Sequence, residues 1–183
     1  MRVITGSCRG KKLKTLESLD TRPTTDMVKE AVFSIIQFDV PASSVLDLFA
    51  GSGQMGIEAL SRGASHCVFV DNPEAVAIVK DNVDSCGFNK ESRVLCMDSL
   101  EYLKVAKAGL DIVFIDPPYR MGIVEKALEL VESKLNDGAI IVCEHEKELE
   151  LGESYGRLKL HKRYKYGKTA LTVYKIPMKE VDY

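Results

Sequence analysis

One stretch, residues 45–56, constrains what this chain can fold into more than any other. It reads VLDLFAGSGQMG, an apolar run that ends in an acid and breaks into a glycine loop before a helical pattern begins. This order predicts a buried strand, a tight turn and a helix start. Gly51, Gly53 and Gly56 have the G-x-G-x-x-G spacing of loops that hold nucleotide-bearing cofactors. The loop alone identifies no ligand, because many glycine loops bind nothing.

Two acids indicate which cofactor the loop would take. In a dinucleotide site the loop amides and the helix N-terminus hold a pyrophosphate, which a carboxylate at the strand end would repel. Asp47 instead suits a ligand with an ammonium and a sulfonium, S-adenosylmethionine, although a helix cap or loop acid would also fit there. Asp71 follows the next apolar run, 20 positions after Gly51. An acid at that place can accept two ribose hydroxyls in either cofactor class.

A second fixed point is the run LDIVFIDPPY at residues 110–119. Its two prolines cannot extend a central strand, because neither offers an N–H. They fix a rigid loop at the strand's carboxyl end, where open α/β sheets bind ligands. We expect the Asp116 carboxylate and the Pro117 carbonyl to lie side by side as acceptors for the two N–H groups of an exocyclic amine. Pro118 completes the loop, and Tyr119 can stack on the base.

Four motifs spread over nearly the whole chain carry a resemblance to a known family. They are RPTTD at 22–26, DLFAGSG at 47–53, EALSRGA at 58–64 and DPPY at 116–119. With them the chain resembles the bacterial methyltransferases that modify the N2 amine of a guanine in 16S ribosomal RNA. The glycine loop and the DPPY run are shared with many amino-methyltransferases. The RPTTD motif, with the basic N-terminal segment ahead of it, is the narrower mark.

The resemblance implies a fold, a cofactor and a set of site residues. The fold is α/β, a Rossmann-like class I methyltransferase with a seven-stranded, mostly parallel sheet, an antiparallel end and helices on both faces, plus a small N-terminal β-hairpin. The cofactor is S-adenosyl-L-methionine, held by Asp47, Phe49, Gly51, Ser52, Gly53, Asp71, Asn72, Met97, Asp98 and Ser99. Asp98 and Met97 are assigned by position beside the adenine, and Asp98 fits a helix cap equally well.

The charge distribution indicates a nucleic-acid partner, although the net charge is only −2. Residues 1–14 carry +5 and residues 157–168 carry +6, with no acid in either segment, so the rest of the chain carries −13. Two basic segments around an acidic body suit a local grip on phosphates, but solvated strand faces would look the same. We expect contacts to ribosomal RNA, free or in an assembling small subunit, from Arg9, Lys11, Lys12, Arg22, Thr24 and Tyr119. Arg22 and Thr24 are also compatible with an ion pair and a helix cap.

Strand and helix patterns alternate through most of the chain, which predicts a parallel sheet covered on both faces. Strands are predicted at 44–48, 67–71, 92–96, 111–116 and 138–144, and helices at 25–38, 54–62, 73–86, 99–107 and 121–135. The runs 157–165 and 169–176 predict a closing hairpin. We expect one methyltransferase domain over residues 1–183, with a basic hairpin appended at 1–20 and a catalytic core at 21–183.

Several classes of protein and site are disfavoured. The five cysteines form no C-x-x-C and the three histidines are scattered, so neither a disulfide framework nor a metal site is expected. No apolar run reaches the ~18 residues of a membrane helix, and the start lacks the apolar core of a signal peptide. We therefore expect a cytoplasmic protein without membrane contacts. Nothing in the sequence implies an oligomer.

Three alternatives remain open at this point. A DNA or protein amine methyltransferase would have the same fold, although an asparagine in place of Asp116 is the common form for adenine N6 and glutamine N5. A nicotinamide oxidoreductase fits the glycine spacing and Asp71, while Asp47 and the proline loop count against it. A non-catalytic RNA-binding or ribosome-assembly module is disfavoured by the intact DPPY run.

Overall fold

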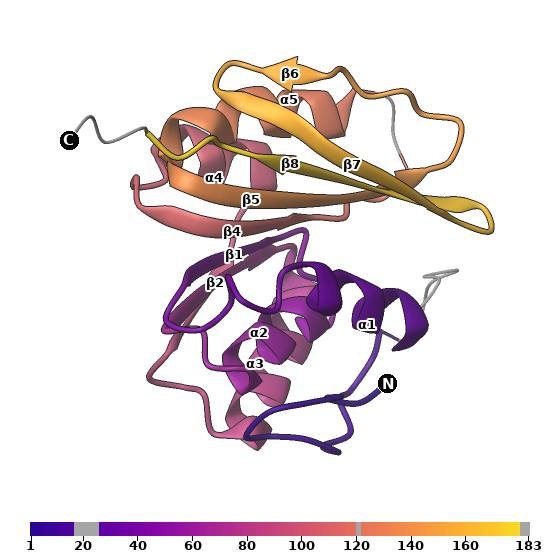
Figure 1. The fold of residues 1–183 in the computed structure, drawn as a ribbon. Coiled ribbons are helices and arrows are strands. Elements are labelled where there is room, and N and C mark those ends of the chain that lie inside the picture. The colour runs from indigo at the N-terminus through magenta and orange to yellow at the C-terminus, as the bar shows by residue number, and fades with distance from the viewer. Residues whose placement is uncertain (17–25, 120–121, 180–183) are drawn as a thin grey trace.

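The protein is built around one mixed sheet with helices on both faces (Figure 1). The computed structural model describes residues 1–16, 26–119 and 122–179. Its strands are β1 (Ser44–Leu48), β2 (His66–Asp71), β3 (Ser92–Cys96), β4 (Leu110–Ile115), β5 (Leu135–Glu146), β6 (Ser154–Tyr155), β7 (Leu158–Tyr166) and β8 (Thr169–Lys175). Its helices are α1 (Asp26–Ile35), α2 (Gln54–Ser61), α3 (Pro73–Cys86), α4 (Ser99–Val105) and α5 (Ile123–Val131), followed by the 3₁₀ turn η1 (Glu132–Lys134).

The strand order is β3-β2-β1-β4-β5-β8-β7-β6. The first five strands in this order are parallel, and β8, β7 and β6 are joined by antiparallel pairing. This confirms the Rossmann-like α/β fold with an antiparallel end. The predicted count of seven strands is wrong by one, because the two-residue β6 adds an eighth at the edge of β7.

Two apolar layers hold the helices against the sheet. Figure 1 shows α1, α2 and α3 on one face and α4 and α5 on the other. On the first face the rings of Phe33 and Phe114 lie 5.7 Å apart between centroids. On the second face Leu128 from α5 packs in one cluster with Val113 and Tyr174. Strands buried on both sides read as continuous apolar runs, which is why β1, β2 and β4 could be located in the sequence.

The predicted N-terminal β-hairpin is not present. Backbone hydrogen bonds join residues 1–3 to residues 10–13, but the only bridge among them is the antiparallel one between Arg2 and Lys12, and no strand forms there. The next residues of the segment bind the helices. The Glu58 carboxylate accepts the backbone N–H groups of Ile4 at 2.8 Å and Thr5 at 3.0 Å. Because the Ile4 and Thr5 N–H groups bind Glu58, the pairing does not extend past Val3 into a two-stranded ladder.

A buried ionic cluster anchors this segment to α1 and α2. Lys29 and Glu58 are both fully buried, with 3.6 Å between Nζ and Oε2. Lys29 also donates to the Arg2 carbonyl at 2.6 Å, and Arg62 Nε donates to Glu58 at 2.8 Å. Burial lowers the pKa of Lys29, while the charge of Glu58 opposes that shift. A buried charge is retained only where such partners surround it, so residues 1–16 belong structurally to the α1–α3 face.

The predicted helix at 121–135 ends earlier than expected. Helix α5 stops at Val131, and Asn136, Asp137 and Gly138 lie inside the long strand β5. Gly138 has a φ of +78°, and the β4–β5 register shifts between Leu110 and Ile112. The run NDG at 136–138 therefore forms an irregular entry into β5.

Candidate active site

The predicted catalytic and cofactor-binding residues meet at one edge of the sheet, where the parallel strands end. Strand order reverses between β1 and β4, and such a switch point is where open α/β sheets bind ligands. The glycine loop follows β1 and the DPPY run follows β4, so both lie at this point. Asp71 ends β2 and Met97 follows β3, and the Met97 N–H donates to the Asp71 carbonyl at 3.1 Å. We call the β1–β3 part the cofactor half and the β4–β5 part the acceptor half.

Asp47 is a buried carboxylate under the glycine loop. Only 3% of the residue is exposed, and its Oδ2 accepts the Gly56 N–H at 2.9 Å. Burial raises its pKa to about 8, the Gly56 hydrogen bond opposes this, and the charge of Asp71 adds to it. A buried carboxylate with a single backbone donor is a favourable partner for a cation.

Asp71 is held by backbone amides. Its Oδ2 accepts the Gly51 N–H and its Oδ1 accepts the Asn72 N–H, each at 2.7 Å. Asn72 in turn caps α3, because its Oδ1 accepts the Ala75 N–H at 3.0 Å. Asp71 therefore fixes the glycine loop against β2. Each carboxylate oxygen retains a further lone pair for a ribose hydroxyl.

The loop between β1 and α2 has a constrained backbone. Phe49 has a φ of +60°, which is rare for an aromatic residue and typical of functional sites. Gly53 is left-handed at +77°, and a Cβ there would come within 3.2 Å of Val79. A Cβ at Gly56 would come within 2.3 Å of the Phe69 ring, so this glycine allows α2 to pack on β2. Ser52 lies beside them, and its carbonyl accepts from Asn82 Nδ2 at 2.9 Å.

The residues after β3 lie next to this loop. Asp98 is the N-cap of α4, since its Oδ1 accepts the Glu101 N–H at 2.9 Å. Asp98 is therefore a helix cap, as one of the two interpretations expected. Its carboxylate oxygens each keep a lone pair, so the contact to the adenine stays a prediction. Met97 is 38% exposed, as a side chain that covers a ring would be, whereas Ser99 is 5% exposed.

The acceptor half contains a cavity of about 130 Å³. Residues from three places in the chain line it: Pro117, Pro118 and Tyr119 after β4, Val124 from α5, and Glu144, His145, Glu146 and Leu149 around the end of β5. Tyr119 is 47% exposed. Sequence reasoning missed Glu144. The only indication in the sequence is its position: Glu144 and Glu146, in the run CEHE at 143–146, lie at the end of the strand that pairs with β4.

Asp116 and Glu144 are neighbours across the two strands. Ile115 pairs with Cys143, so the next residues, Asp116 and Glu144, extend the same register on the face covered by α1–α3. Asp116 is exposed to solvent at the end of β4. Its pKa lies well above the usual range because of lost hydration first, then the charges of Glu144 and Asp47. Two carboxylates so placed favour a ligand with several N–H donors.

His145 belongs to the framework of the cavity. Its two ring nitrogens lie 2.8 Å from the Glu146 carbonyl oxygen and 2.7 Å from Thr172 Oγ1. Burial lowers its pKa, so the ring is neutral near pH 7.

The predicted substrate-binding residues are separated in the structure. Arg9, Lys11 and Lys12 are exposed on the N-terminal segment, whose turn lies against Ser61 at the far end of α2 from the glycine loop. Arg22 and Thr24 lie outside the described residues.

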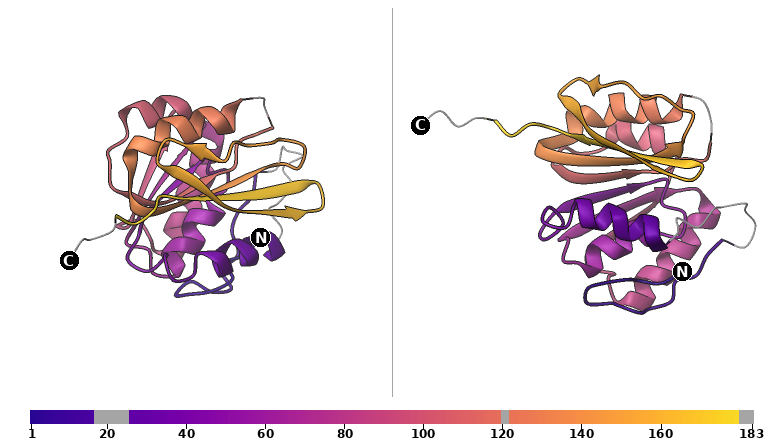
Figure 2. Two further views of the ribbon diagram at one scale, coloured as in Figure 1. Left: turned by 45° about the horizontal axis from the view of Figure 1, so that its top comes forward. Right: turned by 45° about the vertical axis from the view of Figure 1, so that its right-hand side comes forward.

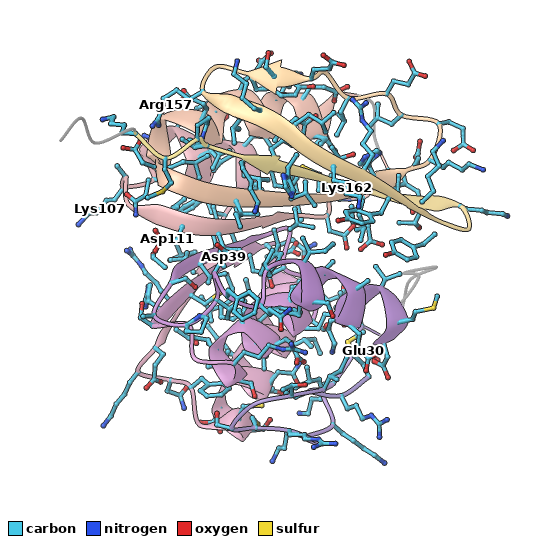
Figure 3. All side chains as sticks on the ribbon, in the orientation of Figure 1. Glu30, Asp39, Lys107, Asp111, Arg157 and Lys162 are labelled. Carbon is cyan, nitrogen blue, oxygen red and sulfur yellow. The ribbon has the colours of Figure 1, made fainter. Side chains whose placement is uncertain are left out.

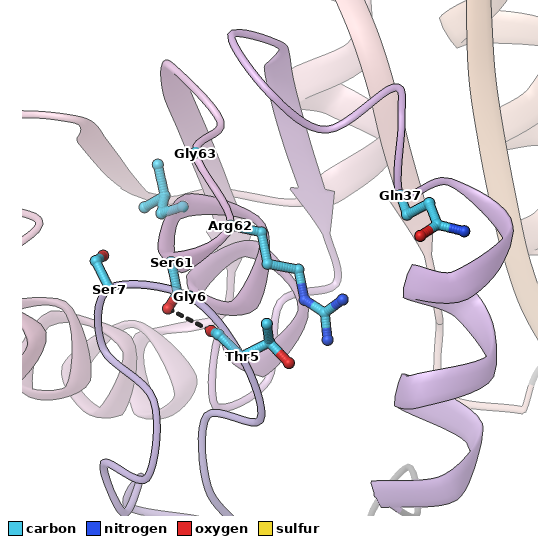
Figure 4. Close-up of a pocket in the computed structure, with 8 residues that line it drawn as sticks. Thr5, Gly6, Ser7, Gln37, Ser61, Arg62 and Gly63 are labelled. Atoms are coloured by element: carbon cyan, nitrogen blue, oxygen red, sulfur yellow. Dashed lines mark hydrogen bonds between the residues drawn. The ribbon is translucent and has the colours of Figure 1, made fainter.

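A larger hollow of about 500 Å³ lies at that far end of α2, away from the carboxyl ends of the strands (Figure 4). Thr5 and Ser61 line it, joined by a hydrogen bond of 2.6 Å from Ser61 Oγ to the Thr5 carbonyl. Its cation, Arg62, is bound to Glu58 and lies 4.6 Å over the Phe33 ring. This hollow is separate from the site.

Comparison with known proteins fits this arrangement. The sequence matches the family described as Conserved hypothetical protein 95 over residues 1–175. The "Putative rRNA methyltransferase YlbH" of Bacillus subtilis (strain 168) is 41% identical over 181 aligned positions, which cover 96% of this chain and 98% of that protein. Ribosomal RNA small subunit methyltransferase D of Escherichia coli (strain K12) is 34% identical over 178 positions, 95% of this chain and 89% of that protein. The chain belongs to the RsmD/YlbH family.

A solved structure of the same family extends the likeness to the fold. The "Putative methyltransferase yhhF from Escherichia coli" has a TM-score of 0.88 and 32% identity, and the match covers 98% of this chain and 99% of that one. The RsmD/YlbH family consists of S-adenosylmethionine-dependent methyltransferases, so the predicted cofactor is confirmed.

The cofactor half fits S-adenosylmethionine by its own chemistry. Asp47 offers a buried carboxylate to a cation. The Cβ direction of Gly51 meets no atom within 4 Å, which leaves room for a ligand against the loop. Gln54 Oε1 at the start of α2 is buried and has no hydrogen-bond partner among the described residues. These features suit a ligand with an ammonium group better than a pyrophosphate.

The described residues contain neither a metal cluster nor a membrane-spanning helix. No group of three or more potential metal-binding side chains occurs in residues 1–16, 26–119 and 122–179. Within the same ranges no helix is long and apolar enough to cross a membrane.

Proposed function

We propose that this protein transfers a methyl group from S-adenosylmethionine to the exocyclic N2 amine of a guanine in the RNA of the small ribosomal subunit. The observation that carries the proposal is the pair Asp116 and Glu144, next to each other at the end of β4 and β5 beside the DPPY cavity. Guanine presents an N1–H and an N2 amine on one edge. Adenine presents an acceptor, N1, beside its amine. Two carboxylates attract the first edge and repel the second.

The RNA substrate is supported by the relatives. The Escherichia coli relative carries the name of a small-subunit ribosomal RNA methyltransferase, and the Bacillus subtilis relative carries that of a ribosomal RNA methyltransferase. Such a substrate would be met in the cytoplasm. The target base has to leave any stack to enter a cavity of this kind, so a single-stranded or flipped guanine is expected.

In the proposed mechanism the protein positions the amine and stabilises charge. S-adenosylmethionine supplies an electrophilic methyl group: the N2–CH₃ bond forms as the S–CH₃ bond breaks. The lone pair of a guanine N2 is delocalised into the ring, so the free amine is a weak nucleophile. Asp116 and the Pro117 carbonyl accept its two N–H groups and favour a pyramidal nitrogen. The surplus proton then passes to Asp116 or to water.

The remaining residues orient the two substrates. Glu144 accepts the N1–H, and Tyr119 stacks on the base from the rim of the cavity. Asp47 holds the ammonium of the cofactor and Asp71 its ribose. Positioning and preorganised electrostatics of this sort supply most of the rate in such transfers. Arg9, Lys11, Lys12, Arg22 and Thr24 are proposed to hold RNA outside the pocket.

Methyl transfer from labelled S-adenosylmethionine tests the proposal. The acceptors are small-subunit RNA, assembled small subunits, large-subunit RNA and DNA from a strain that lacks the gene. We expect label in the small-subunit samples, and labelling about 10²–10³-fold slower with Asp116→Ala enzyme. Transfer to DNA or to protein with unlabelled RNA would contradict the proposal.

A further inference from the structure

The strand β7 presents two tyrosines and a lysine on one face of the sheet. Tyr164 and Tyr166 are half-buried and pack against the same apolar cluster as α1, and Lys162 is exposed. Lys162 Nζ lies 5.1 Å from the centroid of the Tyr164 ring, within cation–π range. Figure 3 labels Lys162 on β7, above α1 in that view. We call Lys162, Tyr164 and Tyr166 the tyrosine–lysine face.

Strand register connects this face to the acceptor half. Glu144 pairs with Leu171, and Leu171 pairs with Tyr164. Glu146, which lines the acceptor cavity, pairs with Thr169, and Thr169 pairs with Tyr166. Residues opposite each other in a sheet point to the same face. Asp116, Glu144 and Tyr164 therefore form one row, with about 14 Å from β4 to β7 at ~4.8 Å per strand. Figure 2 shows the β7–β8 hairpin alongside β5 in both views.

The charge of this face is available to a ligand. Among the described residues, Lys159, Lys162 and Lys175 form no ion pair, and Lys159 and Lys175 are paired opposite each other farther along the same face. These charges act on a neighbouring side chain. The pKa of His161 is lowered first by loss of hydration and then by the positive charges of Lys175 and Lys162. Unpaired lysines beside half-exposed aromatic rings are the combination that binds single-stranded nucleic acid.

Two other cations of the same basic segment have structural partners. Arg157 binds Glu132 and Asp137, and Arg163 donates to the Leu151 carbonyl on the opposite face. The +6 of residues 157–168 thus divides into cations that hold the fold and cations that remain free for phosphates. Lys165 is exposed on the face opposite to Lys162 and serves as a matched control.

From this placement, and resting on the proposed function, we infer that the tyrosine–lysine face binds the single-stranded RNA next to the methylated guanine. Tyr166 and Tyr164 stack on neighbouring bases, and Lys162 binds a phosphate next to the base on Tyr164. The five residues from Lys162 to Tyr166 span about 13 Å, a length suited to a few nucleotides. The target guanine is then held by Asp116 and Glu144 at the end of the same row, beside the DPPY cavity.

Fluorescence anisotropy with a labelled single-stranded RNA of about 12 nucleotides tests the inference. Lys162→Gln combined with Tyr164→Leu and Tyr166→Leu should weaken binding at least about tenfold, because stacking on each ring contributes appreciably. Tyr164→Phe with Tyr166→Phe should retain binding within about twofold, since Phe stacks equally well. Lys165→Gln, on the other face, should also stay within about twofold. Thermal melting and S-adenosylmethionine affinity should match the parent, which shows that the leucine variants are folded.

The outcomes separate this inference from the proposed function. Equal RNA affinity of the triple variant and Lys165→Gln would overturn the inference, and so would a parent that binds no single-stranded RNA. A parent that loses RNA affinity through this face but methylates another atom would uphold the inference and contradict the proposed function. If the leucine variant misfolds, the single variant Lys162→Gln replaces it in the test. That variant must weaken RNA binding more than Lys165→Gln does, or the inference is overturned.

Discussion

The two halves of the catalytic edge use the same kind of side chain in different ways. In the cofactor half, backbone amides hold the carboxylates: Gly56 donates to Asp47, and Gly51 donates to Asp71. In the acceptor half, Asp116 accepts no hydrogen bond from the described residues, and its pKa is raised first by loss of hydration and then by the charge of its neighbour Glu144. The protein's own N–H groups thus hold the carboxylates of the cofactor half, whereas Asp116 in the acceptor half is left to bind the N–H groups of a substrate. Variants in the cofactor half should therefore affect cofactor binding, and variants in the acceptor half should affect methyl transfer.

The largest expected effect is at Asp116. Asp116→Ala should lower turnover about 10²–10³-fold, because it removes a preorganised electrostatic contact to the amine. Affinity for S-adenosylmethionine should stay within a few-fold. The reciprocal variant, Asp71→Asn, should weaken cofactor binding first, since it loosens Gly51. Single-turnover kinetics and calorimetry on both proteins give the answer, and near-normal turnover in Asp116→Ala would remove that residue from the mechanism.

Glu144→Gln should lower kcat/KM for RNA about 10- to 100-fold, the range of a hydrogen bond to a charged group. It should also change the pH profile. Glu144 raises the pKa of Asp116, so removing its charge lowers that pKa. The acid side of the kcat/KM profile, where Asp116 becomes ionised, should therefore move to lower pH. Glu129→Gln, at an exposed position of α5, is the matched control. An unshifted profile would separate Glu144 from Asp116.

Asp47 predicts a pH dependence of cofactor binding. Its pKa is about 8 in the folded protein and 3.8 ordinarily, so between these values the folded protein holds a proton that the unfolded chain has lost. Stability without cofactor should fall as pH rises through this window. Affinity for S-adenosylmethionine should rise in the same window, because the ionised carboxylate binds its ammonium. Asp47→Asn should flatten both trends in thermal melts and calorimetry. A cofactor affinity that falls towards pH 8 would contradict this assignment.

The smallest effect is expected at the N-terminal segment, which packs with the cofactor-side helices. Changing Arg9, Lys11 and Lys12 together to Ala should weaken RNA binding modestly. It should flatten the slope of log affinity against log salt by up to about 2 units, at about 0.7 per phosphate contact on a single strand. These side chains are exposed, so melting temperature and cofactor affinity should not change. Unchanged slopes in a salt titration would mean that these charges are only solvated.

Local patterns predicted the fold well where burial is two-sided. The apolar runs of β1 and β4 and the glycine loop were sufficient to place Asp47 and Asp116 at one edge. The N-terminal segment was predicted wrongly because its partners are distant in sequence. Glu58 lies more than 50 positions from Ile4, and no local pattern shows that their groups bind.

The acceptor half shows the same limit. The place of Glu144 beside Asp116 follows only from the register of β4 and β5. The place of Tyr164 in the same row follows only from two further strand pairings, β5 with β8 and β8 with β7. Charge counting found the basic segment at 157–168. It could not distinguish Arg157, which holds η1, from Lys162, which is free of ion pairs among the described residues. Such roles depend on tertiary contacts.

The most direct test of the account is the modified nucleoside itself. Ribosomal RNA from a strain without this gene is digested, and its nucleosides are mapped by mass spectrometry beside those of the parent. The account predicts the loss of one N2-methylguanosine from the small-subunit RNA, restored in full by the parent gene, to a much lower extent by Asp116→Ala and not at all by an empty vector. An unchanged set of N2-methylguanosines, with a methyl group lost from another atom or another RNA, would contradict it.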